Sequence, residues 1–242
     1  MARYDRVIVF SHLQADVLER LGVPSERLVV IPNGVDPHRW CPAKPGLLSP
    51  ALNSVRQRLG QQRTFLYMGR LATEKNVEAL LRAWRLVSPQ GCRLVIVGDG
   101  PLRSSLQNKF SNTDIVWWGH EPDLDIRVAL LQCAEVFILP SLVEGLSLAL
   151  LEAMASGTAC VATDAGADGE VLEGGAGIVL STQGVTTQLR TLLPVLRDQP
   201  VLTAELGRRA RIRALDRYTI NRNIDAIEML YDDLLRTQAL AA

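Results

Sequence analysis

Short hydrophobic runs alternate with longer segments of helical periodicity along most of the chain. From residue 64 onward the alternation is regular, and the hydrophobic runs contain few polar residues. This pattern predicts strands that are buried on both faces and separated by helices, which is typical of a parallel sheet with helices on both sides. Strands are predicted at 6–10, 28–31, 64–68, 94–97, 115–118, 136–139, 159–162 and 177–180.

The predicted helices carry residues that favour helix starts and stops. Ser11 can cap a first helix and Gly22 follows its end, and Ser49 and Gly60 bracket a second one in the same way. Further helices are predicted at 76–87, 101–110, 124–132, 146–155, around 170, and at 185–196, 201–216 and 220–237. Six strands with these connecting helices predict a doubly wound, Rossmann-like α/β lobe. Four prolines between residues 36 and 50 predict a linker ahead of it.

Composition limits the classes of function. The 242 residues are 48% hydrophobic and 21% charged, so a packed core is expected. Lysine plus arginine equals aspartate plus glutamate, at 26 each, which argues against nucleic-acid binding because that needs a basic surface. The start of the sequence, MARYDRVIVF, has no apolar region of signal-peptide length, and no charge-free apolar run reaches the roughly 18 residues of a membrane span. A cytoplasmic protein is therefore expected, and a peripheral position at the membrane stays open.

The cysteine pattern indicates neither a disulfide framework nor a metal site. Cys41, Cys92, Cys133 and Cys160 form no CxxC pair, and their neighbours lack metal-ligand spacing. Three of the four lie in or beside apolar runs. We interpret them as small core residues of a protein in a reducing compartment.

Polar loops follow the predicted strands, at the edge of the sheet where ligands of such folds bind. After the strand at 64–68 come Gly69, Arg70 and Lys75, which place two cations beside a predicted helix N-terminus. Helix N-termini favour anions, arginine can hold phosphate oxygens in a fork, and lysine adds a mobile charge. Two solvated surface cations are the alternative, but the position after a strand favours an anion site.

The segment 140–157 carries the richest chemistry. Glu144 and Gly145 lie at a strand-to-helix corner, where free backbone N–H groups can meet a phosphate. Glu152 interrupts an otherwise apolar helix, so its carboxylate must be paired, hydrogen-bonded or facing a cleft. A carboxylate that accepts hydrogen bonds from two hydroxyl groups can hold a ribose. A glutamate on the helix surface is the alternative.

Three further loops carry weaker signals. The Gly-Asp-Gly turn at 98–100 lacks the third glycine of a dinucleotide fingerprint, because Arg103 stands there, so we interpret it as a tight turn into a helix. His120 follows the strand at 115–118 and could line a base pocket, although a loop histidine is more often solvated. The small and acidic residues of 163–170 suit the close approach of a ligand.

Together these motifs resemble the carboxyl-terminal, nucleotide-sugar-binding lobe of retaining GT-B glycosyltransferases of the family 4, or group 1, type. The resemblance covers nearly the whole chain, and its most specific element is the pair Glu144 and Glu152 inside EGLSLALLEAMA. The motifs that carry it are IPNGVD (31–36), GRLATEK (69–75), VGDGP (97–101), PSLVEGLSLALLEAMASGTACVAT (140–163) and GEVLEGGAGIVL (169–180).

The resemblance implies roles for individual residues. Arg70 and Lys75 would neutralise the donor diphosphate, and Glu144 would lie beside the transferred sugar, so these three would be the catalytic residues. The other implied contacts are backbone N–H groups of Gly145, Leu146 and Ser147 to phosphate or sugar, Glu152 to the ribose hydroxyls, and Gly119 and His120 to the base. The donor would be a nucleoside-diphosphate sugar. No cofactor or metal is expected, because two cations and a helix terminus take the role that Mg²⁺ has elsewhere.

The resemblance also implies a division of the chain. Residues 1–32 would be a remnant of the amino-terminal acceptor lobe, 33–63 a linker and lead-in helix, 64–218 the donor lobe, and 219–242 a helix that crosses back to the other lobe. Most of the acceptor lobe has no counterpart here, so we expect either weak self-association or dependence on a partner chain that supplies this lobe. A second departure is Ala167, followed by Asp168, where the family usually has another glycine.

Three functions fit these observations. The first is an enzyme of the hexosyltransferase type that moves a sugar, with retention, to a glycan or lipid acceptor. The second is a nucleotide-sugar-binding module, or a partner-dependent subunit, without independent transferase activity. The third is a GT-B epimerase or phosphorylase, which the glutamate pair and the GRLATEK loop disfavour. The base, the sugar and the acceptor stay open.

Overall fold

A six-stranded parallel sheet forms the centre of the protein. The computed structural model describes residues 4–111 and 114–241. The sheet has the order β5-β4-β3-β6-β7-β8, so the chain reverses its direction of travel between β3 and β6. Its strands are β3 (Arg63–Met68), β4 (Cys92–Val97), β5 (Ile115–Gly119), β6 (Ala134–Leu139), β7 (Ala159–Thr163) and β8 (Ile178–Leu180). The predicted doubly wound α/β lobe is confirmed.

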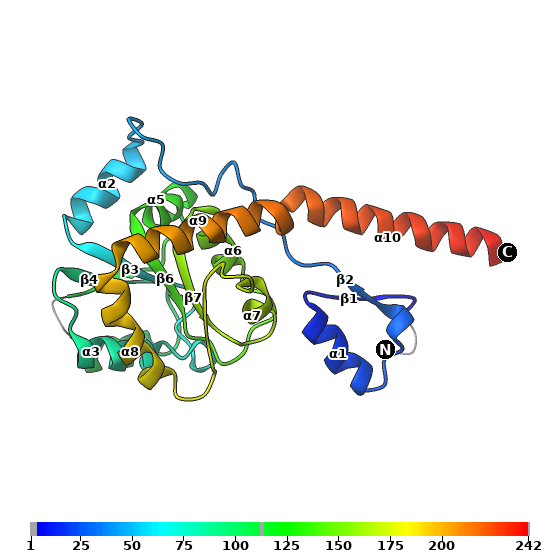
Figure 1. Ribbon diagram of the computed structural model, residues 1–242, viewed down its shortest axis with the longest axis horizontal. Coiled ribbons are helices and arrows are strands. Elements are labelled where there is room, and N and C mark those ends of the chain that lie inside the picture. The colour runs from blue at the N-terminus through cyan, green and yellow to red at the C-terminus, as the bar shows by residue number, and fades with distance from the viewer. Residues whose placement is uncertain (1–3, 112–113, 242) are drawn as a thin grey trace.

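Helices cover both faces of this sheet. Figure 1 shows α5, α6 and α9 on one side of the strands and α3 and α8 on the other, and α2 packs against α5. The helices are α2 (Pro50–Leu59), α3 (Val77–Val87), α4 (Arg103–Lys109), α5 (Leu124–Cys133), α6 (Leu148–Ala155), α7 (Asp168–Val171), α8 (Val185–Asp198) and α9 (Pro200–Arg217). This two-sided cover explains why the strands have hydrophobic residues at nearly every position rather than in alternation.

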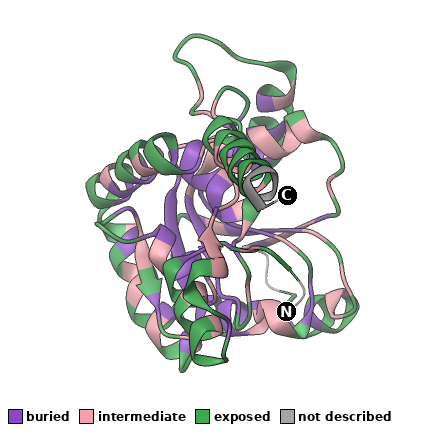
Figure 2. Cartoon of the chain, turned by 90° about the vertical axis from the view of Figure 1, so that its right-hand side faces the viewer, coloured by how far each residue is buried: buried purple, intermediate pink, exposed green. Residues whose placement is uncertain are grey.

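The core lies between the sheet and these helices. In Figure 2 the buried residues concentrate along the strands and the inward faces of the helices. Phe65 of β3 and Trp84 of α3 meet edge to face, with ring centroids 5.3 Å apart. The Trp84 indole N–H donates to Asp114 Oδ2 at 2.7 Å, so its one polar atom is satisfied inside the core.

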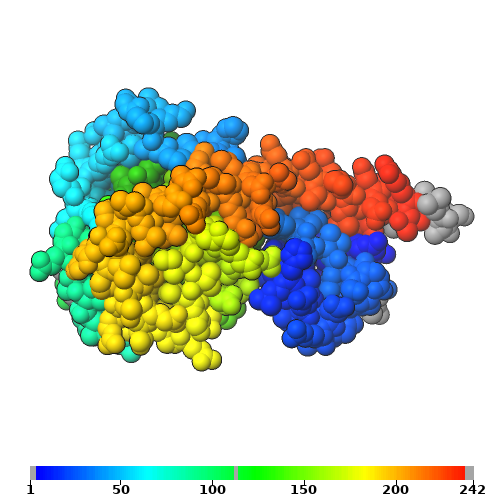
Figure 3. All heavy atoms as spheres, viewed as in Figure 1, coloured from blue at the N-terminus to red at the C-terminus, as the bar shows by residue number. Residues whose placement is uncertain are grey.

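Residues 4–31 form a small unit beside the lobe. Its two strands, β1 (Val7–Val9) and β2 (Leu28–Val30), pair in parallel around α1 (His12–Arg20). Glu170 of α7 connects this unit to the lobe, because its carboxylate accepts from the His12 N–H at 3.0 Å and lies 3.1 Å from the His12 ring. Figure 3 shows the unit resting against the lobe and under the last helix.

The last helix, α10 (Ile220–Ala241), projects away from the sheet (Figure 1). Val35 pairs with Thr219 at its start, and Asn223 donates to Pro32 O at 2.7 Å, so the linker and α10 leave the lobe together. Met229, Tyr231 and Leu235 remain largely exposed. No helix among the described residues is both long and apolar enough to cross a membrane.

Most element boundaries agree with the sequence predictions to within a few residues. The clearest difference is α4, which starts at Arg103 and not at Pro101. Leu102 N–H donates to Leu71 O at 3.0 Å, and this contact with the neighbouring loop holds residues 100–102 in a turn. Long-range hydrogen bonds of this kind are invisible in a local sequence pattern, and they delay the helix start.

Candidate functional site

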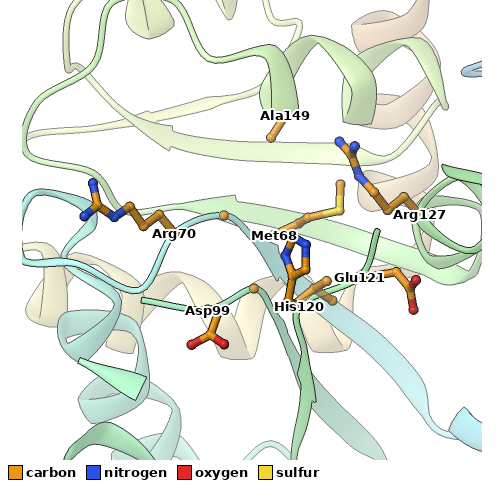
Figure 4. Close-up of a pocket in the computed structure, with 10 residues that line it drawn as sticks. Met68, Arg70, Asp99, His120, Glu121, Arg127 and Ala149 are labelled. Carbon is orange, nitrogen blue, oxygen red and sulfur yellow. The ribbon is translucent and has the colours of Figure 1, made fainter. Parts of the chain in front are cut away.

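A pocket of about 360 Å³ lies at the carboxyl ends of β3 and β4, beside the loop that follows β5. Doubly wound sheets bind ligands at this edge, next to the point where the strand order reverses. Figure 4 shows Ala149 and Arg127 on one side of the pocket and Asp99 and His120 on the opposite side. The lining residues are Met68, Gly69, Arg70, Val97, Gly98, Asp99, His120, Glu121, Arg127 and Ala149.

Close contact between the loops after β3 and β4 builds one wall of this pocket. Leu71 N–H donates to Asp99 O at 2.8 Å, and Gly69 N–H donates to Val97 O at 3.0 Å. A Cβ atom at Gly98 would lie 1.9 Å from Gly69 O, so only glycine fits at this position. The Gly-Asp-Gly segment is therefore a tight turn that packs the two loops together.

Two predicted ligand contacts, Arg70 and His120, both line the pocket. Both side chains are exposed, and the Arg70 guanidinium has no ion pair or hydrogen bond with the other described residues. The Tyr67 hydroxyl donates to Arg70 O at 2.7 Å, which fixes the backbone from which that guanidinium projects. Gly119 lies behind His120 in β5, where its carbonyl accepts from Gly98 N–H at 2.7 Å.

Lys75 and Glu144, which are not among the residues that line this pocket, form an ion pair between the loops after β3 and β6. Lys75 Nζ lies 2.6 Å from Glu144 Oε1, and Ser141 Oγ donates to the same oxygen at 2.7 Å. The Glu144 side chain is only 8% exposed, and a carboxylate removed from water to this degree requires such partners. Lys75 belongs to the short 3₁₀ helix η2 (Thr73–Lys75) rather than to the first turn of α3.

The start of α6 carries a second carboxylate. Asp168 is buried, and its Oδ1 accepts from the Ser147 N–H at 2.9 Å. Burial, reinforced by the nearby charge of Glu144, raises the pKa of Asp168 to about 7, against the opposing effects of the Ser147 hydrogen bond and Lys75. Of the three backbone donors implied for phosphate or sugar, Ser147 is thus already engaged, whereas the N–H groups of Gly145 and Leu146 have no acceptor within the described part of the chain.

The loop after β7 packs directly on this corner. A Cβ atom at Gly166 would lie 2.1 Å from Glu144 O, and Ala167 N–H donates to Gly145 O at 2.8 Å. Ala167 itself is completely buried. The departure from a second glycine at position 167 therefore places a methyl group in the protein interior, and the charge that follows it caps α6.

Glu152 is paired, as its position in an apolar helix requires. Arg127 of α5 donates from Nη2 to both Glu152 carboxylate oxygens, at 3.1 and 2.9 Å. Burial raises the pKa of Glu152, and the positive charge of Arg127 opposes that shift. Arg127 reaches the pocket lining, so the pair connects Glu152 to the pocket.

The sequence interpretation missed Arg127, Ser141 and the capping role of Asp168. A signal for Arg127 was present, because it is the cation within the apolar part of helix 124–133, just as Glu152 interrupts α6. Two opposite charges on neighbouring apolar helices of a predicted sheet are candidates for a pair. Nothing in the sequence pattern indicates the hydrogen-bond partners of Asp168 and Ser141.

Within the described residues there is no cluster of three histidine, cysteine or acidic side chains that could hold a metal ion. The positive groups at the pocket are the Arg70 and Arg127 side chains. Asp99 and Glu121 line the pocket as well, so it offers guanidinium groups to an oxyanion and carboxylates to hydroxyl groups.

Comparison with known proteins places these features in a family. A sequence model described as "Glycosyl transferases group 1" matches residues 62–198, and one described as "Glycosyltransferase Family 4" matches residues 1–39. The chain is 29% identical over 230 residues to an alpha-maltose-1-phosphate synthase of Mycolicibacterium smegmatis, covering 88% of this chain and 59% of the relative. It is 27% identical over 231 residues to the UDP-Gal:alpha-D-GlcNAc-diphosphoundecaprenol alpha-1,3-galactosyltransferase of Escherichia coli, covering 90% and 57%.

Among solved structures, the fold is similar to that of the Anabaena protein Alr3699/HepE, crystallised in complex with UDP-glucose. The TM-score is 0.81 at 20% sequence identity, and the match covers 95% of this chain and 65% of the other. The chain thus spans less than two thirds of the length of the proteins that it resembles.

Proposed function

The chain belongs to the group 1 glycosyltransferases, and we propose that it binds a nucleoside-diphosphate sugar and takes part in transferring that sugar, with retention, to a glycan or lipid hydroxyl. One observation carries this proposal. Arg70, the Arg127–Glu152 pair and the Lys75–Glu144 pair gather at the carboxyl edge of the sheet, around the strand reversal between β3 and β6. Ligands of doubly wound folds bind at this edge.

In the proposed mechanism, Arg70 and Lys75 stabilise the charge of the leaving diphosphate. Breaking the bond between the sugar and the diphosphate leaves negative charge on the nucleotide. Arg70, which is exposed in the pocket, would hold the phosphate oxygens, and Lys75 would share its charge between Glu144 and the diphosphate. These residues would perform the task without a metal ion.

The remaining contacts follow from the positions of the carboxylates. Glu152, held by Arg127, would accept from the ribose hydroxyls. Glu144 would lie beside the sugar, where its partners Lys75 and Ser141 keep the carboxylate in place. In the retaining course, the acceptor oxygen would bond to the anomeric carbon on the face that the nucleotide leaves, and its proton would pass to the departing diphosphate oxygen.

The class of acceptor is proposed from the relatives. The name of the E. coli relative gives a diphosphoundecaprenol-linked sugar as its acceptor. An acceptor of the same kind would bring this protein to the cytoplasmic surface of a membrane as a peripheral protein. We also propose that residues 64–218 bind the donor, and that the acceptor is held largely by a further lobe or partner chain.

Calorimetric titration with UDP, GDP and ADP, each with and without EDTA, tests the proposal. We expect at least one of the three to bind, with an affinity that EDTA does not change. Failure of all three to bind, or binding only with a divalent metal, would contradict it.

The alternative is a binding module without its own transferase activity. The apolar side chains exposed on α10 and on the β1–α1 unit favour this alternative for the chain by itself, because they form surfaces suited to further protein. An assay of donor consumption with sugar acceptors distinguishes the two functions: a binding module takes up the donor and leaves it intact.

A further inference from the structure

Among the described residues, Arg127 is the one charged partner of the Glu152 carboxylate. Its side chain is 13% exposed, and both of its oxygens accept from the single Nη2 atom of Arg127. Leu151 and Ala153, its neighbours in α6, are fully buried. Arg127 is therefore the cation that allows a charged carboxylate to exist at this place.

Arg127 is in turn fixed by the linker. Its guanidinium carbon lies 5.4 Å from the centroid of the Trp40 ring, and Trp40 is itself buried. Arg211 of α9 donates to the Trp40 carbonyl at 3.3 Å and also to the carbonyl of Ala155, at the end of α6. The linker, α5, α6 and α9 thus meet around Trp40, and this meeting holds the Arg127 side chain against Glu152.

Each carboxylate oxygen can accept more than one hydrogen bond. The Arg127 contact uses one acceptor site on each oxygen of Glu152 and leaves the others for hydroxyl groups. Because a single nitrogen bridges both oxygens, it also limits rotation of the carboxylate about its own axis. A vicinal diol would then meet two acceptor oxygens of fixed orientation.

We propose that Arg127 is a positioning residue that holds Glu152 charged and correctly oriented for the ribose hydroxyls of the donor. This inference rests on the proposed role of Glu152 and adds a residue that the family motifs do not contain. Arg127 acts through Glu152, so its loss should affect the recognition of the ribose more than the binding of the diphosphate.

The test measures how strongly the chain prefers a ribose with hydroxyl groups to one without them, rather than the affinity for one ligand alone. The affinity of the full-length chain is compared for a ribonucleoside diphosphate and for its 2′,3′-dideoxy analogue, at pH 6 and at pH 8.5. The ratio of the two affinities removes effects that are common to both ligands, such as changes in the charge of the ligand phosphate, of Asp168 or of the other ionisable groups that line the pocket, namely Arg70, Asp99, His120 and Glu121. Arg211 of α9 keeps its charge over this range.

Three variants complete the test. In Arg127→Gln, Glu152 loses its cation but stays buried, which favours the protonated carboxyl group. We therefore expect the ratio of ribonucleotide to dideoxynucleotide affinity to fall about tenfold or more at pH 6. The ratio should recover in part at pH 8.5, where the carboxyl group loses its proton more readily. Arg127→Lys restores a positive charge without the bridging nitrogen, and we expect a ratio that is independent of pH and intermediate in size. Arg39→Gln, which removes the exposed cation paired with Asp125 on the same helix, should leave the ratio unchanged.

The outcomes separate this inference from the proposed function. A wild-type chain that prefers the ribonucleotide, together with an Arg127→Gln variant of the same ratio at both pH values, would overturn the inference and leave the proposed function standing. A wild-type chain that binds the ribonucleotide and its dideoxy analogue with equal affinity would contradict the proposed contact between Glu152 and the ribose. It would contradict the inference about Arg127 as well. Circular dichroism of each variant shows whether it is folded, and Arg127→Lys supplies the comparison should Arg127→Gln not fold.

Discussion

The Asp168 carboxylate accepts a hydrogen bond from the Ser147 backbone N–H at 2.9 Å, so the protein supplies its own anion at the start of α6. Helix N-termini favour negative charge, which explains why an acidic residue is tolerated there. Burial nevertheless dominates and raises the pKa of Asp168 to about 7. The group is therefore half protonated close to neutral pH.

Asp168 should make the stability of the protein depend on pH. Its pKa in the folded state is above the ordinary value of 3.8, so the folded state binds more protons than the unfolded state between about pH 4 and pH 7. The contribution of Asp168 to the free energy of unfolding is fully present below about pH 4 and is lost as the pH rises through about 7. Asp168→Asn keeps an acceptor oxygen and should remove this loss, with an upper bound of about 4 kcal/mol because one unit of pKa is about 1.4 kcal/mol.

Urea unfolding at pH 5 and pH 8 measures this effect. The control is Asp164→Asn, an exposed acid in the same loop. A difference between pH 5 and pH 8 that is as large in Asp168→Asn as in the wild type would assign the pH dependence to another group.

Arg70→Ala should weaken the binding of a nucleoside diphosphate by about one to two orders of magnitude. A hydrogen bond to a charged group contributes about 1.5–3 kcal/mol, and about 1.4 kcal/mol corresponds to a tenfold change in affinity. Calorimetry of Arg70→Ala beside Arg82→Ala, an exposed arginine on α3, measures the difference. Equal affinities of the Arg70→Ala and Arg82→Ala variants would show that Arg70 is a surface cation without a role in binding.

Glu152→Ala should weaken the binding of a ribonucleotide far more than that of its dideoxyribose analogue, because only the hydroxyl groups can donate to the carboxylate. Arg127 loses its partner in this variant, and any general effect of that loss on the pocket applies to both ligands. Competition binding with the two nucleotides gives the comparison. Losses of the same size would show that Glu152 has a structural role only.

The Lys75–Glu144 pair should contribute measurably to stability. Lys75→Met leaves the carboxylate of Glu144 with Ser141 as its remaining partner, and we expect a loss below the roughly 3–5 kcal/mol of a fully buried pair, because Lys75 is 23% exposed. The double variant Lys75→Met/Glu144→Gln should recover part of this loss. A double-mutant cycle by thermal unfolding gives the coupling energy, and a value near zero would mean that the ion pair has no energetic role.

The purified chain should associate weakly with itself and transfer sugar poorly by itself. Met229, Tyr231 and Leu235 of α10 are each more than 60% exposed, and Ile8, Leu13 and Val17 add apolar surface on the β1–α1 unit. Light scattering of the wild type and of Tyr231→Lys/Leu235→Lys tests the association, since charges on this face should shift the mass toward that of a monomer. Efficient acceptor-dependent turnover by a monomer would be the contrary result.

Local patterns in the sequence were sufficient to predict the fold. The strands at 64–68 and 159–162 are buried on both faces, so their composition differs from that of any helix or loop nearby, and capping residues such as Ser49 set helix starts. The apolar positions of α10 differ in exposure. Ile224 and Tyr231 are exposed, but Ile227, Leu230 and Leu234 are half-buried.

Pairings between distant segments could not be read in the same way. Lys75 and Glu144 come from two loops joined by neither periodicity nor spacing, and their contact exists because β3 and β6 are adjacent in the sheet. Asp168 was recognised as a departure from the family, but its hydrogen bond to Ser147 depends on how the loop after β7 closes over α6. The roles of these residues toward a donor stay predictions.

The adjacency of β3 and β6 also decides when the site can exist as the chain is made. Between these two strands the chain runs through α3, β4, α4, β5 and α5, so their pairing must wait for a long loop to close. A ribosome that has released β3, β4 and β5 has made most of the pocket lining, but neither Glu144 nor Glu152. The proposed donor site would therefore be completed late in synthesis, when β6 enters the middle of the sheet and α6 follows it.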